Sequence, residues 1–311
     1  MRAIRRWVAA AGLVAVVTAV IGFAYVRPLT IVEAYAAARL RIEGVRSAYV
    51  QVGPYLLHYL EAGSGEPLVL VHGLASSATQ DWGRLIAPLS RRRFHVYAPD
   101  LPGFGGSERP AAADYSIPMQ VEAVRGFMQA VGLGRARVAG ISMGGWIVCR
   151  LAGEHPEMVE RLLAVDAAGM RPDGPAIPAE VLLPRDEEGV RRLVAAVRYN
   201  APPLPSFVAR DVLARKQRDE WIVRRALESM REGRDWLNGN LRRADMPILI
   251  LWGKEDALIP VAYAARLAAE FEHARLEVLD GCGHVPMADC PEAFDREMMA
   301  FLFDGGAAPP P

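Results

Sequence analysis

Lysine and cysteine are scarce in this sequence, and its formal net charge is zero. Lys216 and Lys254 are its only lysines, and its 36 basic side chains are balanced by 36 acidic ones. No segment combines clustered basic residues with interleaved aromatic residues, as a groove for nucleic acid would. We therefore expect no nucleic-acid partner.

The three cysteines are too few for a disulfide framework and lack the spacing of a zinc site. They are Cys149, Cys282 and Cys290. Because unpaired cysteine commonly behaves as a small buried hydrophobic residue, we expect all three to be reduced and buried. The alternative is a bridge between Cys282 and Cys290, which would require an oxidising compartment.

Charge is also missing from residues 7–26, which follow a short N-terminus that carries three arginines. A helix of this length spans about 30 Å, which matches the hydrocarbon core of a bilayer. Trp7 and Tyr25 would lie at the two interfaces, where amphipathic rings are favoured. We expect residues 1–44 to form a membrane anchor, with a transmembrane helix over 7–26 and a linker helix over 29–42.

A cleaved signal peptide and a helix buried on every side are the alternatives for this segment. The apolar run is longer than that of a typical signal peptide, and no small-residue cleavage site directly follows it. The basic N-terminus favours a cytoplasmic start and an exported domain, held at the inner membrane of a bacterium. A cleaved signal would instead leave a secreted or periplasmic protein.

Short apolar runs alternate with helical patterns along most of the remaining chain. The expected strands are two within residues 49–60, broken at Gly53-Pro54, and one each over 68–71, 94–98, 136–139, 162–165, 248–251 and 276–279. The expected helices cover residues 82–89, 119–131, 144–152, 261–271 and 291–303. Strands that alternate with helices predict the α/β class, with a mostly parallel central sheet flanked by helices.

The alternation stops between residues 171 and 243, where helical patterns continue without strands. We expect residues 171–243 to form a helical cap, inserted into a core made of residues 45–170 and 244–304. The tail of residues 305–311 contains only small residues and proline. We expect this tail to be disordered.

The clearest motif is GISMG at residues 140–144, between an expected strand and an expected helix. This pattern in this context is typical of a nucleophile elbow, in which a serine lies on a strained strand-to-helix turn. The glycines allow the backbone to pass closely where a side chain would clash. We therefore predict Ser142 as the nucleophile, and a glycine turn made only for packing is the alternative.

An acid and a histidine each follow a later strand. Asp256, in the segment WGKED, and His284, in the segment GCGH, both come directly after an expected strand. The carboxyl ends of parallel strands meet at one edge of a sheet, and serine, acid, histidine is a known catalytic order. We predict His284 as the general base and Asp256 as the residue that orients it. Asp166 also ends an expected strand and is the alternative acid.

The segment HGL at residues 72–74 directly follows the strand expected over 68–71. Such a loop supplies part of an oxyanion hole, and we assign the two donors to the backbone amides of Leu74 and Met143. His72 itself is expected to be structural, because a catalytic histidine at this position would break the chain order. Chemistry of this kind requires no metal and no organic cofactor.

Together these segments resemble the motifs of the α/β-hydrolase superfamily. The motifs are HG at 72–73, DLPGFG at 100–105, the serine elbow, WGKED at 252–256 and GCGH at 281–284, and the resemblance covers residues 45–302. It implies a serine hydrolase with the α/β-hydrolase fold. The expected molecule therefore has this fold, an inserted helical cap and an N-terminal transmembrane helix.

Within the superfamily, the chain is similar to membrane-anchored monoacylglycerol lipases and related bacterial lipases. In those proteins a transmembrane helix directly precedes the hydrolase domain, and the aromatic and proline-rich run at residues 199–207 also resembles theirs. The resemblance implies carboxylic ester substrates with an acyl chain, such as monoacylglycerols. It also implies contact with membrane lipid through the N-terminal helix.

Two other functions are compatible with these residues. Carbon–carbon bond hydrolases of aromatic degradation keep the same serine, acid and histidine, although the loop that corresponds to residues 72–77 is usually richer in glycine in them. A non-catalytic binding protein on this scaffold usually lacks one of the three residues, and all three are present here. Haloalkane dehalogenases and epoxide hydrolases carry aspartate at the elbow, so Ser142 argues against both.

Overall fold

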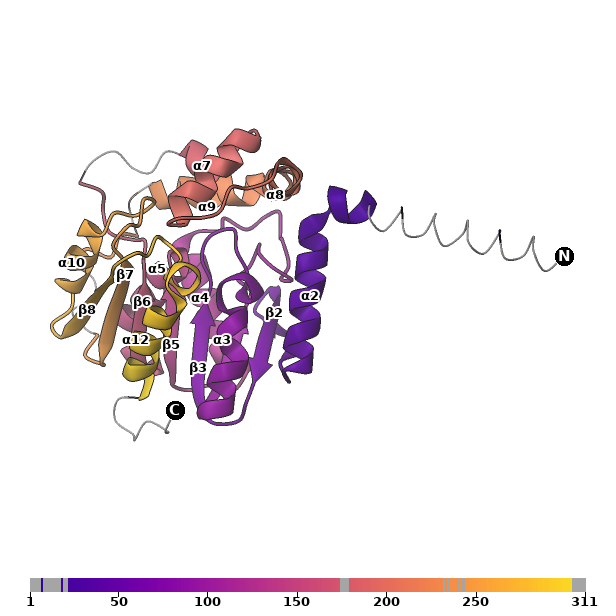
Figure 1. Ribbon diagram of the computed structural model, residues 1–311. Coiled ribbons are helices and arrows are strands. Elements are labelled where there is room, and N and C mark those ends of the chain that lie inside the picture. Colours follow the sequence, from indigo (N-terminus) through magenta and orange to yellow (C-terminus); the bar gives the residue numbers. More distant parts are fainter. Residues whose placement is uncertain are drawn as a thin grey trace.

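A sheet of eight strands, with helices on both faces, forms the centre of the part of the chain that the structure describes (Figure 1). The structure is a computed structural model, and it describes residues 7, 18, 22–173, 179–231, 233, 235–239, 241 and 244–303. The strands are β1 (Arg46–Val52), β2 (Tyr55–Ala62), β3 (Glu66–Val71), β4 (Phe94–Pro99), β5 (Ala136–Ile141), β6 (Val159–Val165), β7 (Ile248–Gly253) and β8 (Ala274–Leu279). Their order across the sheet is β1-β2-β4-β3-β5-β6-β7-β8.

Most neighbouring strands of this sheet are parallel. β2 pairs antiparallel with both β1 and β4, whereas every other pair, from β4–β3 to β7–β8, is parallel. Each strand that the sequence predicts is present, and the mostly parallel sheet is confirmed. Because parallel strands end at the same edge, the loops that follow β3, β5, β6, β7 and β8 lie along one side of the sheet.

Alternate residues of the buried strands belong to two different hydrophobic clusters, one on each face of the sheet. On β3, Val69 and Val71 belong to one cluster, whereas Leu68 and Leu70 belong to the other. This two-sided burial explains why the strand is apolar at four consecutive positions.

The flanking helices are α3 (Ala78–Arg92), α4 (Ile117–Ala130), α5 (Met143–Glu154), α10 (Ala262–Ala268) and α12 (Pro291–Phe303), with two short helices, η1 (Pro156–Met158) and α11 (Pro286–Asp289).

The described chain between β6 and β7 forms four helices, which lie above the carboxyl edge of the sheet in Figure 1. They are α6 (Ala179–Leu182), α7 (Glu187–Val197), α8 (Ser206–Arg218) and α9 (Glu220–Arg231), and we call them the helical insertion. Its buried residues include Val190, Ile222 and Ala226, which follow the apolar periodicity of the sequence. Residues 174–178, 232, 234, 240, 242 and 243 of the expected cap lie outside the described residues.

The helix α2 (Pro28–Ile42) packs against α8 and α3 at the edge of the domain. Two side chains of α8 hold its first turns. The Leu29 amide donates to Asp211 Oδ2 at 2.9 Å, and Arg215 pairs with Glu33 at 2.5 Å. Asp211 is buried, and through its hydrogen bond to the Leu29 amide it caps the N-terminus of α2.

The transmembrane helix expected over residues 7–26 falls largely outside the described residues, which omit 1–6, 8–17 and 19–21. Among the helices that the structure does describe, none combines the length and the apolar character needed to cross a bilayer. The tail expected to be disordered, residues 305–311, also lies outside the described residues.

Candidate active site

Ser142 occupies the turn between β5 and α5. Its backbone has φ 55° and ψ −118°, a conformation that costs a non-glycine residue about 1–3 kcal/mol. Three hydrogen bonds hold this turn. The Ser142 amide donates to the Val165 carbonyl at 2.9 Å, and the Ser142 carbonyl accepts from the amides of Trp146 at 3.1 Å and Ala168 at 3.0 Å. The turn thus has the strained geometry of a nucleophile elbow.

Two glycines allow the backbone to close around this turn. A Cβ atom added at Gly140 would lie 2.2 Å from the Gly144 carbonyl oxygen, and one added at Gly144 would lie 2.3 Å from the Val71 carbonyl oxygen. Both distances are far shorter than a van der Waals contact between nonbonded atoms. A side chain at either position would therefore displace the backbone that carries Ser142.

His284 and Asp256 form a buried pair at the same edge of the sheet. The His284 Nδ1 atom lies 2.7 Å from Asp256 Oδ2. Asp256 Oδ1 accepts hydrogen bonds from the amides of Leu258 and Ile259, both at 2.8 Å. Because an ionised carboxylate can only accept, this pairing keeps a proton on Nδ1 and leaves Nε2 of the neutral imidazole as an acceptor.

A pocket of about 1220 Å³ brings the residues that the sequence predicts to one place. Ser142, His284, Leu74 and Met143 all line it, and Asp256 is hydrogen-bonded to His284. The helical insertion supplies much of the apolar wall, through residues that include Leu193, Val197, Val212, Val223 and Leu227. The pocket therefore lies between the carboxyl edge of the sheet and the helical insertion.

The two amides assigned to an oxyanion hole belong to residues at the wall of this pocket. Within the described residues, neither the Leu74 amide nor the Met143 amide donates a hydrogen bond. Both are therefore available to a negatively charged oxygen in the pocket. Asp81 of α3 holds the loop between β3 and α3, because it accepts from the Gly73 amide at 2.8 Å and from the Ser76 hydroxyl at 2.6 Å.

His72 begins the same loop and has a structural place in it. Its Nδ1 donates to the Gly73 carbonyl at 2.7 Å, and its Nε2 accepts from the Leu101 amide at 2.9 Å. The side chain is completely buried. Since both ring nitrogens are used, His72 has no nitrogen left to act as a base.

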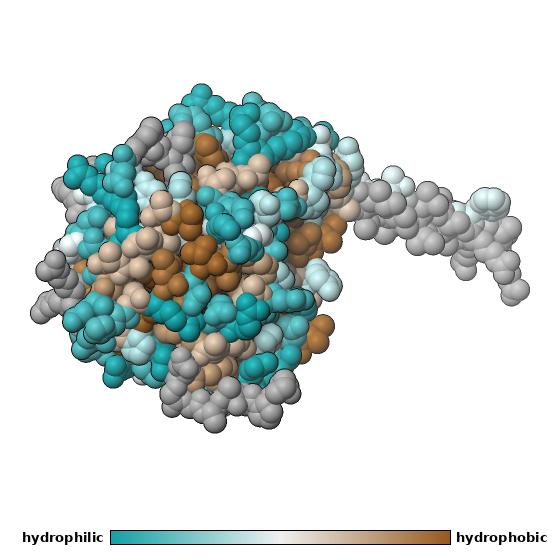
Figure 2. Space-filling view, turned by 60° about the vertical axis from the view of Figure 1, so that its left-hand side comes forward, coloured by the Kyte–Doolittle hydropathy of each residue, from teal (hydrophilic) through white to brown (hydrophobic). Residues whose placement is uncertain are grey.

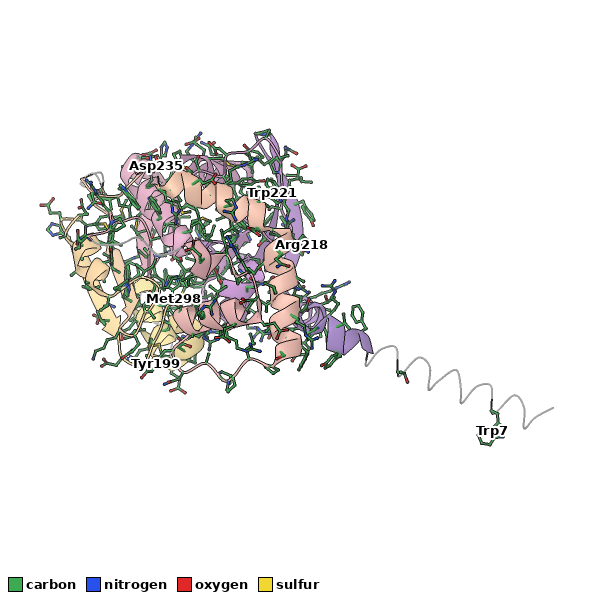
Figure 3. All side chains as sticks on the ribbon, turned by 90° about the horizontal axis from the view of Figure 1, so that it is seen from above. Trp7, Tyr199, Arg218, Trp221, Asp235 and Met298 are labelled. Carbon is green, nitrogen blue, oxygen red and sulfur yellow. A yellow bond between two sulfur atoms is a disulfide. The ribbon has the colours of Figure 1, made fainter. Side chains whose placement is uncertain are left out.

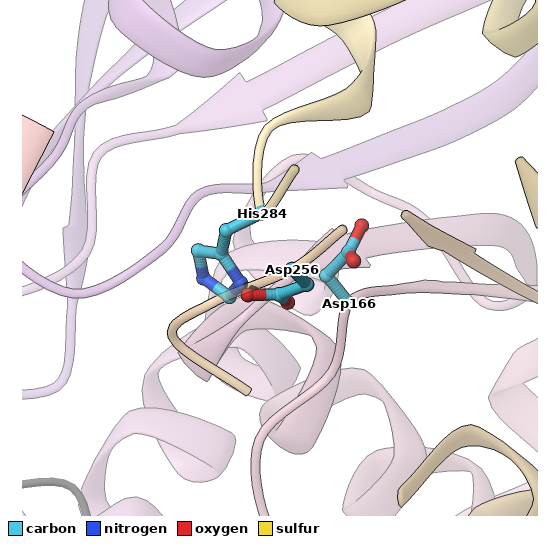
Figure 4. Close-up of side chains that lie close together, drawn as sticks. All are labelled: Asp166, Asp256 and His284. Carbon is cyan, nitrogen blue, oxygen red and sulfur yellow. Dashed lines mark hydrogen bonds and ion pairs between the residues drawn. The ribbon is translucent and has the colours of Figure 1, made fainter. Parts of the chain in front are cut away.

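A third acid, Asp166, lies beside His284 and Asp256 (Figure 4). Its Oδ1 accepts from the Gly253 amide at 2.9 Å, and its Oδ2 has no partner among the described residues. Complete burial, followed by the nearby Asp256 carboxylate, raises the pKa of Asp166 well above its ordinary value. The imidazole is hydrogen-bonded to Asp256, whereas Asp166 is favoured in its protonated form.

Asp166, Asp256 and His284 are close enough to act as metal ligands, since one candidate atom from each lies within 4.8 Å of the others. Their hydrogen bonds describe a different arrangement. Among the described residues, His284 Nδ1 and both oxygens of Asp256 have protein partners, whereas His284 Nε2 and Asp166 Oδ2 have none. Because a zinc site takes at least three protein ligands, these side chains fit an acid–histidine pair better than a metal site.

The cysteine expectation is wrong for two of the three residues. Cys282 and Cys290 form a disulfide, with a Cα–Cα distance of 5.7 Å, whereas Cys149 is free and buried as expected. The bridge closes the segment that contains His284. The separation of eight residues was visible in the sequence, but it does not reveal that this segment folds back on itself through α11.

Lys216 is a residue of the pocket that no pattern in the sequence indicated. Lys216 comes from α8, and its Nζ donates to the Ala75 carbonyl on the loop between β3 and α3, at 3.1 Å. The two residues are far apart in the chain and lie in no shared motif. Their contact depends on how the helical insertion packs over the sheet.

The comparison with known families agrees with the fold. Residues 68–297 match the alpha/beta hydrolase family. The chain belongs to this family. The superfamily resemblance expected from the sequence motifs is therefore confirmed, together with the α/β-hydrolase fold.

This alpha/beta hydrolase is similar to hydrolases of different activities. Lipase 3 of Moraxella sp. strain TA144 is 28% identical over 250 residues, which cover 76% of this chain and 78% of that protein. The 2-hydroxymuconate semialdehyde hydrolase of Pseudomonas sp. strain CF600 is 29% identical over 266 residues, which cover 80% of this chain and 90% of that protein. The crystal structure of a bacterial membrane phospholipase A is similar with a TM-score of 0.81 and 32% identity, over 96% of this chain and 98% of that one.

Proposed function

We propose that this alpha/beta hydrolase cleaves carboxylic esters through an acyl-enzyme on Ser142, and that its substrates are lipid esters such as monoacylglycerols. The observation that carries the proposal is the 2.7 Å pair of His284 and Asp256 beside a pocket that Ser142 also lines. The similarity to a lipase and to a membrane phospholipase A supports the ester class.

The chemistry follows from the positions of these groups. A serine hydroxyl is a weak nucleophile at neutral pH, so His284 takes the Ser142 proton as the serine oxygen attacks the ester carbonyl carbon. Asp256 stabilises the imidazolium that forms. The carbonyl oxygen becomes negative and accepts hydrogen bonds from the amides of Leu74 and Met143.

The tetrahedral intermediate then collapses to the acyl-enzyme. The bond to the alcohol oxygen breaks, and His284 delivers its proton to the leaving alcohol. A water molecule next attacks the acyl-enzyme while His284 takes one of its protons. Release of the carboxylic acid restores the Ser142 hydroxyl, so one ester and one water give one alcohol and one acid.

The pocket supports a substrate with a long apolar part. Its volume of about 1220 Å³ exceeds the roughly 300–1,000 Å³ of ordinary small-molecule sites. Side chains of α7, α8 and α9, such as Val197, Val212 and Leu227, make much of its wall apolar. Such a wall favours an acyl chain over a sugar or a charged peptide.

The test of the proposed function combines labelling with turnover. A fluorophosphonate probe should label the protein, and Ser142→Ala should abolish both labelling and ester hydrolysis while the thermal unfolding midpoint stays close to that of the parent protein. A chain-length series of monoacylglycerols and p-nitrophenyl esters should show a preference for medium or long acyl chains. Substantial turnover by Ser142→Ala would refute the assignment of the nucleophile.

A carbon–carbon bond hydrolase is the second candidate, and the similarity to the 2-hydroxymuconate semialdehyde hydrolase favours it. The same serine, histidine and acid would serve this reaction. Turnover of a dienol ketone acid without activity on esters would select this candidate. A protein that binds without catalysis would neither label with the probe nor turn over either substrate.

We also propose that residues 7–26 anchor this domain in a bacterial inner membrane, with the domain on the exported side. The described residues at the end of this segment and just after it expose apolar side chains, with Phe23, Val26 and Val32 all more than half exposed. Figure 2 shows hydrophobic surface at the edge of the domain where the continuously described chain begins. The disulfide between Cys282 and Cys290 supports an oxidising compartment.

The location has a direct test in cells. The full chain should pellet with membranes and resist extraction by salt, whereas a chain without residues 1–26 should be soluble. The mass of the mature protein distinguishes an anchor from a cleaved signal, because cleavage would remove the N-terminal residues. A mature protein that lacks residues 1–26 would refute the anchor.

A further inference from the structure

Lys216 joins the helical insertion to the loop between β3 and α3. It lies near the end of α8, and its ammonium group donates a hydrogen bond to the Ala75 carbonyl at 3.1 Å. Both residues line the same pocket as Ser142. Ala75 directly follows Leu74, whose unpaired amide is one of the two assigned oxyanion donors.

The loop needs such a contact because its backbone is strained. Ala75 has φ 55°, a left-handed conformation that residues with a side chain rarely adopt. A strained residue keeps its conformation only when its surroundings fix it. Asp81 of α3 fixes the loop before Ala75 through Gly73, and Lys216 of α8 fixes Ala75 itself.

The position of Lys216 is not explained by packing alone. Burial lowers the pKa of its ammonium group, while Asp81 of α3 and Asp219 at the end of α8 act in the opposite direction. A cation in a mostly apolar pocket is unfavourable unless it is hydrogen-bonded. Arg218, two residues later on the same helix, points away into solvent and pairs with Asp219 (Figure 3).

We propose that Lys216 is a positioning residue for ester hydrolysis: by holding the Ala75 carbonyl, it fixes the direction of the Leu74 amide toward the oxyanion. The proposal rests on the proposed function, since it needs Ser142 as the nucleophile. The contact would matter most in the tetrahedral state, where the carbonyl oxygen carries its charge. Lys216 therefore acts on kcat more than on KM.

The experiment compares four forms of the full-length protein on one p-nitrophenyl ester. Removing an oxyanion donor costs roughly 100–1,000-fold in kcat, and misdirecting one costs less. We expect Lys216→Met to lower kcat about 10–100-fold while KM changes less than about twofold. Lys216→Arg keeps an N–H donor and should recover most of the lost rate. Arg218→Met removes a neighbouring cation outside the pocket and should retain the parent kcat.

The outcomes separate the two proposals. Lys216→Met with an unchanged kcat, a change in KM alone, or no recovery in Lys216→Arg would overturn the positioning role while Ser142 labelling stays intact. If the parent protein does not label with the fluorophosphonate, the proposed function is overturned, and the positioning role of Lys216 with it. If thermal unfolding shows that Lys216→Met is not folded, Lys216→Gln, which keeps a polar but shorter side chain, gives the same comparison.

Discussion

Asp256 and Asp166 follow adjacent strands and both carboxyl groups lie near His284, but it is Asp256 that is hydrogen-bonded to the imidazole, at 2.7 Å. Asp256 Oδ1 also accepts hydrogen bonds from the amides of Leu258 and Ile259. Asp166 accepts from one amide and is favoured in its protonated form. Two carboxyl groups in one buried cluster thus take different roles because only one of them is fully hydrogen-bonded.

The first prediction separates these two acids by activity. Asp256→Asn should lower kcat about 1,000–10,000-fold, because the amide cannot hold the imidazole in the productive tautomer. Asp166→Asn should keep most of the activity, because an amide resembles a protonated carboxyl in shape and can still accept from Gly253. Initial rates on a p-nitrophenyl ester check both variants. An equal loss in the two would show that Asp166 takes part in catalysis.

The second prediction concerns stability and pH. The folded-state pKa of Asp166 is raised, so the folded protein binds more protons than the unfolded chain above the ordinary aspartate pKa of about 3.9. This residue therefore contributes most to stability below that pH, and its contribution falls as the pH rises toward the folded-state pKa. Asp166→Asn removes this dependence, so the variant should gain stability relative to the parent protein as the pH rises from about 4.

Urea unfolding of both proteins at a series of pH values measures this difference directly. A difference in the free energy of unfolding that grows with pH would support the raised pKa. A difference that is the same at every pH would contradict the raised pKa, because Asp166 would then titrate alike in the folded and unfolded states.

The third prediction concerns the disulfide that closes the segment around His284. A bridge over so short a loop stabilises the folded state by about 2–3 kcal/mol in the chain-entropy account. The double variant Cys282→Ala, Cys290→Ala should therefore unfold at a lower temperature, and its kcat should fall because the His284 segment is less restrained. Reductant should have the same effect on the parent protein and none on the variant. An unfolding midpoint that does not respond to reductant would show that the bridge is absent in solution.

The fourth prediction concerns the glycine at the elbow. Gly144→Ala would place a Cβ atom 2.3 Å from the Val71 carbonyl oxygen, so α5 must move away from β3. We expect a loss of about 1–3 kcal/mol in the free energy of unfolding and a lower rate of fluorophosphonate labelling. Gly134→Ala is the matched control, since nothing lies within 4 Å of its added Cβ atom. Equal stability of the two variants would contradict the close approach of α5 and β3.

Much of the fold and the elbow could be predicted from the sequence because the signals are local. Four apolar residues in a row at 68–71 indicate a strand covered on both faces, and β3 is such a strand. Gly140 and Gly144 lie at positions where a Cβ atom would meet backbone. The chain order of Ser142, Asp256 and His284 likewise follows from which strands precede them.

The tertiary structure decided what no local pattern contains. The choice of Asp256 over Asp166 as the partner of His284 depends on how the loops after two neighbouring strands place the two carboxyl groups, both of which lie close to the imidazole. The disulfide depends on a turn that returns Cys290 to Cys282.

The same holds for Lys216, whose contact with Ala75 joins segments 141 residues apart. Periodicity and motifs report the conformation of a short segment and which of its faces is buried, because these depend on neighbours along the chain. A hydrogen bond between distant segments exists only after the helical insertion has packed over the sheet. The sequence by itself determined the strands, the helices and the elbow, whereas packing decided which side chains meet in the pocket.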